Sequence, residues 1–335
     1  MAVEATRRLR PGKARGPRPR GDGGGRGGGP AAGRGRLARL RRDRFLLLLA
    51  LPGIAVVLLF CYLPLLGNVI AFKDYQPFLG ISGSPWVGLS NFDVIFNGDP
   101  EFVTALKNTL IVALAQVVFV FPVPIAVALL LNSLLSERIK RIVQSVLYLP
   151  HFMSWVIVVA LFQSMLGNAG MLNTWLAHHG SGGFHIIGDP GLFKVLITSQ
   201  VVWKDSGWGT ILFLAALSRI DTSLYEAAAV DGASKTRQLW HVTLPGIRGV
   251  VVLMFILKLG DALNTGFEQI LLQQAPVGTD ASEVLDTYVY NHGVINGDWG
   301  VSAAVGLVKG VVSVALVLGA NKVAHIFGER GVYES

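Results

Sequence analysis

Long apolar stretches are the feature that most constrains how this chain folds. A helix needs about 20 consecutive apolar residues to cross a hydrocarbon core of about 30 Å. Hydrophobic residues make up 52% of the 335 residues and charged ones only 15%, whereas roughly 25% of the residues in a soluble domain are charged. The surplus apolar surface must face lipid. We predict six spans, at residues 45–67, 104–132, 143–166, 193–219, 246–272 and 301–324.

The connections between these spans differ in charge, and this predicts their orientation. Short cytoplasmic loops retain Lys and Arg during membrane insertion. Basic side chains gather in the N-terminal region, in two connections and in the C-terminal end, at residues 1–44, 133–142, 220–245 and after 321. The alternate connections are mainly acidic, at residues 68–103, 167–192 and 273–300. We therefore expect both termini in the cytoplasm and one all-α membrane domain over residues 45–325.

The two ends of the chain are predicted to be tails. The net charge of +8 is concentrated in residues 1–44, which are rich in Gly, Arg and Pro. Such a segment has too little apolar surface to fold, so we expect disorder. It lacks the interleaved aromatic residues that stack on nucleic-acid bases, which favours an anionic lipid surface as its partner. Residues 326–335 are predicted to be a short cytoplasmic tail.

Several polar residues lie inside the predicted spans. Lys204 and Asp205 fall in the fourth span, and Lys258, Asp261 and Asn264 in the fifth. Because a charged side chain in hydrocarbon is costly, each of these residues is a candidate functional residue. The alternative is that neighbouring charges neutralise one another or reach the membrane edge.

Prolines are predicted to interrupt two of the spans. Pro122 and Pro124 lie within the second span, and Pro245 begins the fifth. Proline lacks the backbone N–H that continues a helix. We therefore predict breaks at these points, with the released carbonyls satisfied inside a bundle or a cavity.

The basic loop at residues 220–245 carries the most informative pattern. It reads EAAAVDGA over 226–233 and LPG over 244–246. Asp221 is predicted to cap a short helix that Gly232 terminates, and Ser234 to cap a second one. From the residues alone this is a cytoplasmic docking element or an ordinary amphipathic surface helix.

This pattern resembles the Glu-Ala-Ala loop of permease subunits in binding-protein-dependent ATP-binding-cassette importers. The similarity extends over about residues 45–333. Five further segments resemble the maltose-type permeases that carry complex oligosaccharides: Asn108-Thr109, Phe121-Pro122, Ser145 to Ser154 with Tyr148-Leu149-Pro150-His151-Phe152, Trp208-Gly209 and Asp286-Thr287-Tyr288-Val289-Tyr290. The resemblance implies the type I importer permease fold, called MetI-like, and carbohydrate import across a bacterial cell membrane. Thr222 departs from the proline that many relatives have there.

The resemblance also implies how the loop works and what it assembles with. In this family the loop enters a cleft of the ATPase subunit, which gives coupling roles to Glu226, Ala227, Ala228, Asp231, Gly232, Leu244 and Pro245. The implied partners are a second homologous permease, two ATP-binding-cassette ATPases and an extracytoplasmic solute-binding protein. The sequence has no G-x-x-x-x-G-K-[ST] phosphate-binding motif, so we expect those ATPases to hydrolyse the ATP and this chain to be a transporter subunit without a cofactor.

Sugar sites combine aromatic platforms with polar side chains. Within and beside spans three to five, the candidate substrate-binding residues are Trp155, Gln163, Trp203, Lys204, Asp205, Trp208, Asn264, Phe267 and Glu268. The resemblance implies that part of the sugar site lies about 20 residues before Glu226. For the tryptophans the alternative is an interfacial aromatic belt.

Two other classes of function compete with a sugar permease. An ion-coupled secondary transporter would use the intramembrane Lys and Asp residues as a relay, but the loop pattern favours the first interpretation. A membrane-embedded enzyme would need His, Asp or Glu clustered at catalytic or metal-ligand spacing. His178, His179 and His185 gather only in a Gly-rich outer loop, and Cys61 is the only cysteine, so we expect neither a metal site nor a disulfide.

Overall fold

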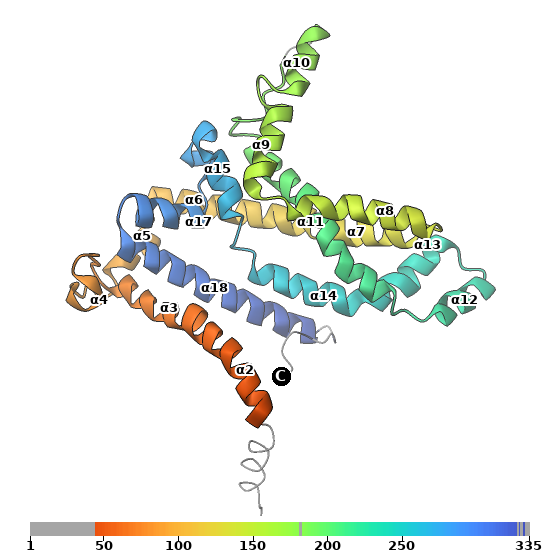
Figure 1. The fold of residues 1–335 in the computed structure, drawn as a ribbon, viewed down its shortest axis with the longest axis horizontal. Helices are drawn as coiled ribbons and strands as arrows, with labels where there is room; N and C mark the ends of the chain where they lie inside the picture. The colour runs from red at the N-terminus through yellow and green to blue at the C-terminus, as the bar shows by residue number, and fades with distance from the viewer. Residues whose placement is uncertain (1–43, 181–182, 327, 329–330, 332–335) are drawn as a thin grey trace, which may run out of the picture. The chain divides into compact units, whose positions relative to one another are not determined.

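The computed structural model describes residues 44–180, 183–326, 328 and 331. Over these residues the chain is helical and has no strand, apart from an isolated bridge between Lys73 and Trp86 (Figure 1). Contacts divide the chain into two units, Met1–Pro64 and Leu65–Ser335. The predicted tail at residues 1–44, except Arg44, and most of the tail at 326–335 lie outside the described residues.

The first apolar helix begins at α2 (Arg44–Val57) and continues through a π-turn, η1 (Leu58–Tyr62), and α3 (Leu63–Leu65). A 3₁₀ segment, η2 (Leu66–Phe72), completes a stretch that is long and apolar enough to cross a membrane over Leu48–Phe72. This stretch corresponds to the first predicted span.

Short helices follow at the predicted outer side: α4 (Gly80–Gly83), η3 (Ser90–Phe92) and α5 (Asp93–Phe96). Lys73, the main basic residue of this segment, bonds through Nζ to the backbone oxygens of Ile81 at 2.7 Å and Ser84 at 3.1 Å. The Asn91 amide donates to the oxygens of Ala71 and Lys73. These bonds satisfy backbone carbonyls that the irregular chain leaves unpaired.

The second span is one uninterrupted helix, so the predicted break at Pro122 and Pro124 is wrong. The helix runs over Pro100–Asn132 through α6 (Pro100–Ala115), the π-turn η4 (Gln116–Val120) and α7 (Pro122–Asn132). In the π-turn the Phe121 N–H bonds to the Gln116 oxygen at 3.0 Å. The wider turn changes the hydrogen-bond register before Pro122, so the missing donor does not stop the helix.

The same type of π-turn precedes two other prolines. A five-residue π-turn ends two residues before Pro64, before Pro122 and before Pro245. At Pro245 the helix passes from α13 (Lys235–Gln238) through η6 (Leu239–Thr243) into α14 (Leu244–Gly260). The predicted break there is also wrong, because one apolar helix covers Lys235–Gly260.

The region of the third predicted span, 143–166, is not one helix. It contains the end of α8 (Glu137–Tyr148), a 3₁₀ turn η5 (Leu149–Phe152) and α9 (Trp155–Leu166), which is followed by α10 (Met171–His178). Alternating charged and apolar residues make α8 amphipathic, and Pro150 ends its hydrogen-bond ladder. The segment that is long and apolar enough to cross is Trp155–His178.

The longest helix of the middle region, α11 (Phe193–Leu217), packs against α7, α8, α14 and η5. It covers the fourth predicted span with 25 residues, but Lys194, Lys204 and Asp205 lower its apolar character. Among the described residues, the other five predicted spans have counterparts that are long and apolar enough to cross a membrane. The sixth crossing and the cytoplasmic location of the termini remain predictions.

The C-terminal helices of the second unit pack against its earlier helices. It comprises α15 (Phe267–Val277), α16 (Thr279–Ser282), α17 (Leu285–Tyr290), the π-turn η7 (Asn291–Ile295) and α18 (Trp299–Ile326). Phe102 of α6, Tyr288 of α17 and Val305 of α18 share one buried cluster. The Asn108 side chain joins α6 to the same region through bonds to the oxygens of Asp280 and Glu283 at 3.0 and 2.9 Å.

The crossing of α8 and α11 depends on Gly207. A Cβ atom at this position would collide with the backbone oxygen of Leu147. We predict that Gly207→Ala lowers thermal stability in detergent, because a backbone collision costs about 1–3 kcal/mol and exceeds the gain in helix propensity of about 1 kcal/mol. Gly310→Ala on α18 is the matched control, since its Cβ would meet nothing within 4 Å. Equal melting temperatures for the two variants would contradict the prediction.

Candidate functional site

The loop that follows α11 forms a capped helical hairpin, as predicted. Asp221 caps α12 (Thr222–Val230) by accepting a bond from the Ser223 N–H at 2.9 Å, and this bond lowers the pKa of Asp221. Gly232 has a φ of 75°, and the N–H groups of Gly232 and Ala233 bond to the oxygens of Ala229 and Ala228. This is a Schellman termination.

The second predicted cap is also confirmed, because the Ser234 side chain accepts from the Arg237 N–H at the start of α13. A short polar side chain in this position satisfies one of the free donors of the first turn. The hairpin is therefore encoded locally, by two caps and one glycine.

α12 projects from the bundle, and none of its nine residues is buried. Its apolar Leu224 and Val230 are 53% and 88% exposed, and Glu226 and Ala227 are exposed as well. A short helix that presents small and apolar side chains suits close contact with another surface. In Figure 1 α12 lies at one extremity of the second unit, beyond α11 and α13.

The exposed hairpin is nevertheless fixed to the bundle. The Tyr225 hydroxyl is 3.0 Å from the Thr243 hydroxyl, which ties α12 to the π-turn that leads into α14. Ile220 lies against Gly246, where a Cβ atom would be 2.8 Å from its Cδ1 atom. The hairpin is therefore joined to α14 by one side-chain bond and, through α13, by a continuous helix.

A polar and aromatic cluster forms where η5 crosses α11. Lys204 Nζ donates to the backbone oxygen of His151 at 2.6 Å, and Asp205 Oδ1 is 2.9 Å from His151 Nδ1. The rings of His151 and Trp208 stack with centroids 4.6 Å apart and planes 4° apart. Lys204 Nζ also lies 5.5 Å from the ring centroid of Trp155.

Local geometry explains this arrangement. Residues 204, 205 and 208 lie on one side of α11, because positions four apart on a helix are neighbours. Gly207 on the same helix admits the backbone of residue 147, so the η5 segment approaches closely. Four of the predicted substrate residues, Trp155, Lys204, Asp205 and Trp208, thus come together.

The remaining predicted substrate residues have other neighbours. Trp203 makes a ring contact with Phe162 at 5.8 Å, and Phe267 with Tyr290 at 5.3 Å. The Asn264 amide donates to Asp261 at 3.3 Å. The side chains of Gln163 and Glu268 are exposed, on α9 and α15 respectively, two helices that pack together.

His151 was not among the predicted site residues, although it has three contacts in this cluster. It lies 54 residues from Asp205 in the sequence, so no helical spacing relates the two. The available signal was its place in the Tyr148–Phe152 segment, which carries part of the family resemblance.

Two further polar networks cross between helices. Lys258 Nζ bonds to Gln116 Oε1 at 3.0 Å, and Gln116 Nε2 bonds to the Thr265 oxygen at 3.2 Å. Three buried glutamines, Gln200, Gln269 and Gln273, join α11 to α15 with bonds of 2.7–3.0 Å. The sequence analysis did not identify the glutamines, because uncharged polar residues in a helix give no distinct pattern.

A separate polar pocket of about 280 Å³ lies between the start of α6 and the segments around α16 and η7. Glu101, Asp280 and Glu283 contribute carboxylates, and Asn291 donates to Glu283 at 2.9 Å. Burial raises the pKa of Glu283. Burial and nearby carboxylates raise the pKa of Tyr288, beside this pocket, to about 12. Over the described residues, no group of His, Cys, Asp or Glu is arranged to hold a metal ion.

The fold and the exposed loop define a class: an all-helical, multi-pass membrane protein with a projecting helical hairpin. A family model described as "Binding-protein-dependent transport system inner membrane component" matches residues 120–327. The chain belongs to this family, and it is a permease subunit of an ATP-binding-cassette transporter rather than an enzyme.

Individual relatives agree with this assignment. The chain is 45% identical over 298 residues to the polygalacturonan/rhamnogalacturonan transport system permease protein YteP of Bacillus subtilis (strain 168), covering 89% of this chain and 92% of the relative. It is 42% identical to protein LplB of the same organism, covering 89% and 93%. A chain of a bacterial alginate ABC transporter, solved in complex with an alginate pentasaccharide-bound periplasmic protein, superimposes with a TM-score of 0.80 at 33% identity and covers 88% of this chain and 99% of that one.

The raised pKa of Glu283 predicts a pH dependence of stability. The folded state binds the proton of Glu283 more tightly than the unfolded state does. The contribution of this carboxyl to stability is therefore largest below its ordinary pKa of 4.5 and is lost as the pH rises through the folded-state pKa. We expect Glu283→Gln to flatten this slope in melting temperatures measured in detergent across a pH series. Glu268→Gln, at an exposed carboxylate, serves as the control. Identical slopes for wild type and Glu283→Gln would contradict the prediction.

Proposed function

We propose that this chain is one of two homologous permeases that form the translocation pathway of an oligosaccharide importer in a bacterial cell membrane. The observation that carries this proposal is the 45% identity to a polygalacturonan/rhamnogalacturonan permease over most of both chains. The proposal includes two partner ATPases and an extracytoplasmic binding protein. It also places six spans within residues 45–325 and both termini in the cytoplasm.

The cargo we propose is an acidic oligosaccharide. The YteP permease is named for polygalacturonan and rhamnogalacturonan, and a structural relative with a TM-score of 0.79 and 34% identity takes part in import of the acidic polysaccharide alginate. In this chain Lys204 and Lys258 place two cationic groups among the helices. A cation in a medium of low dielectric attracts a sugar carboxylate more strongly than it would in water.

Within the cluster at η5, we assign Trp208 the role of sugar platform. Its ring stacks on His151, yet the residue remains 48% exposed. Trp155, Lys204 and Asp205 surround the same segment and would supply further aromatic and polar contacts. Gln163, Trp203, Asn264, Phe267 and Glu268 remain candidates at the edge of the same pathway.

We propose that the α12 hairpin docks into the ATPase. The support is its exposure together with its two attachments to the bundle, the Tyr225–Thr243 bond and the helix that leads through η6 into α14. In this role Glu226, Ala227, Ala228, Asp231 and Gly232 form the contact. Leu244 and Pro245 lie at the start of α14, where the motion enters the membrane.

The alternative of an ion-coupled secondary transporter loses support. The intramembrane Asp205 and Lys258 are engaged with His151 and Gln116, so their bonds hold helices together. Family membership favours ATP-driven transport.

The Gly232 position tests the coupling role. Its Cβ would meet nothing within 4 Å in this chain, so substitution acts through backbone conformation and through the docking surface. A β-branched residue at positive φ costs about 1–2 kcal/mol or more, whereas Asn tolerates that conformation. In the reconstituted importer we expect Gly232→Val to lower uptake at least about tenfold while ATP hydrolysis continues. Gly232→Asn should retain most uptake. Wild-type uptake by the Val variant would refute the coupling role.

Uptake measurements on wild type and Trp208→Ala test both the proposed cargo and the role of Trp208. With the complete importer in proteoliposomes, we expect uptake of an oligogalacturonide, with a neutral oligosaccharide of equal length as a weak competitor. Loss of one stacked aromatic contact removes about 1–3 kcal/mol, so Trp208→Ala should raise KM about fivefold to 150-fold while the ATPase still copurifies. Trp175→Ala is the matched control, because its ring is also exposed and lies against a histidine, His179, but it is not a candidate for the site. Preference for the neutral sugar would reject the acidic cargo, and an unchanged KM would remove Trp208 from the site.

A further inference from the structure

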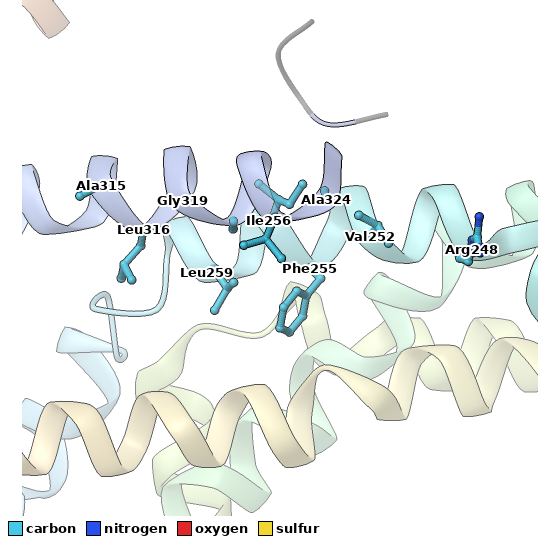
Figure 2. Close-up of a pocket in the computed structure, with 11 residues that line it drawn as sticks. Arg248, Val252, Phe255, Ile256, Leu259, Ala315, Leu316, Gly319 and Ala324 are labelled. Carbon is cyan, nitrogen blue, oxygen red and sulfur yellow. The ribbon is translucent and has the colours of Figure 1, made fainter. Parts of the chain in front are cut away.

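An apolar groove runs between α14 and α18, away from the cluster at η5. It has a volume of about 620 Å³, and eleven residues line it. All but Arg248 are apolar or glycine, and on α18 the wall is built largely from the small residues Ala315, Gly319, Ala320 and Ala324. Figure 2 shows Arg248 at one end of the row of lining residues and Ala315 at the other.

The length of the groove matches one leaflet of a membrane. Its lining on α14 extends from Arg248 to Leu259, which is about 16 Å at 1.5 Å per residue. Half of a hydrocarbon core is about 15 Å. Both walls belong to helices that are long and apolar enough to cross the membrane, so the groove lies along the direction of a lipid chain.

The end of the groove near Leu259 is closed, and the end near Arg248 is cationic. Beyond Leu259 the two helices meet at Gly260, where a Cβ atom would lie 2.6 Å from Val317. The other end lies three residues after Pro245, on the side of the α12 hairpin. Arg248 also interacts within the chain, but a guanidinium has five N–H donors and can share them with a phosphate.

The chemistry of the lining favours an acyl chain. An acyl chain needs no hydrogen-bonding partner, which agrees with a lining that offers one polar side chain.

We propose that this groove is a binding site for an anionic phospholipid of the cytoplasmic leaflet. One acyl chain lies along Val252, Leu259 and Gly319, and the phosphate bonds to Arg248. The cytoplasmic leaflet is the one rich in anionic lipid, and its assignment follows from the predicted orientation of the hairpin. Because α14 continues from the coupling hairpin, the bound lipid braces the helix that carries motion into the membrane.

The test uses the assembled importer in phosphatidylcholine nanodiscs with trace phosphatidylglycerol that is spin-labelled on an acyl chain. We expect wild type to immobilise a fraction of the labelled phosphatidylglycerol. Gly319→Leu should abolish most of this fraction, because a Cβ at Gly319 points into open space within the groove. Gly310→Leu is the matched control, since its Cβ also meets nothing and it lies outside the groove.

Arg248→Gln tests the headgroup contact. One basic side chain near an anionic surface contributes about fivefold in affinity, so the preference for labelled phosphatidylglycerol over labelled phosphatidylcholine should fall about fivefold. Lys322→Gln, at an exposed cation of α18 outside the lining, should leave it unchanged.

Three results would overturn the proposal: no immobilised phosphatidylglycerol in wild type, equal immobilisation by Gly319→Leu and Gly310→Leu, or an unchanged lipid preference in Arg248→Gln. Gly319→Cys in a Cys61→Ser background provides a further measurement. A high-yield crosslink from this cysteine to the partner permease would show that protein fills the groove, and would also overturn it. None of these outcomes depends on which cargo the importer carries.

Discussion

Hydrocarbon offers no hydrogen-bonding partner, so polar groups within this bundle depend on partners inside the protein. Apolar contact alone does little to hold membrane helices together, because lipid tails are equally apolar. In this chain polar side chains connect several distant helices. Asn108 joins α6 to the backbone around α16, the glutamines join α11 to α15, and Lys309 of α18 pairs with Asp286 of α17. These contacts fix the helices that carry the cluster and the hairpin.

In the proposed sugar site, the same constraint lets residues that hold the helices together also face the cargo. Lys204 and Asp205 make α11 less apolar than its neighbours, and both are engaged in holding His151. The aromatic face of Trp208 is oriented by that imidazole. In the proposed pathway, a side chain that satisfies a polar group within the bundle thus also shapes the surface offered to the cargo.

Sequence reasoning succeeded where the determining interactions are local. The two caps and the terminating glycine of the hairpin involve residues within a few positions of one another, and all three were predicted. It failed at Pro122 and Pro245, because a proline pattern does not reveal the π-turn that accommodates it. The predicted third span begins too early in the sequence, because apolar residues continue across the η5 turn. His151 and the glutamines were missed because their partners lie more than 50 residues away.

The π-turns before the prolines have a consequence for helical phase. Each contains one residue more than an α-turn, so the side chains after it are rotated by about 100° from where an unbroken α-helix would place them. In η6 this rotation turns the side chains of α14 about the helix axis relative to those of α13. Deleting one residue between 239 and 243 would keep every side chain of α14 but turn them all about the axis. The extra residue therefore acts as an angular spacer that sets which side chains of the span meet their neighbours.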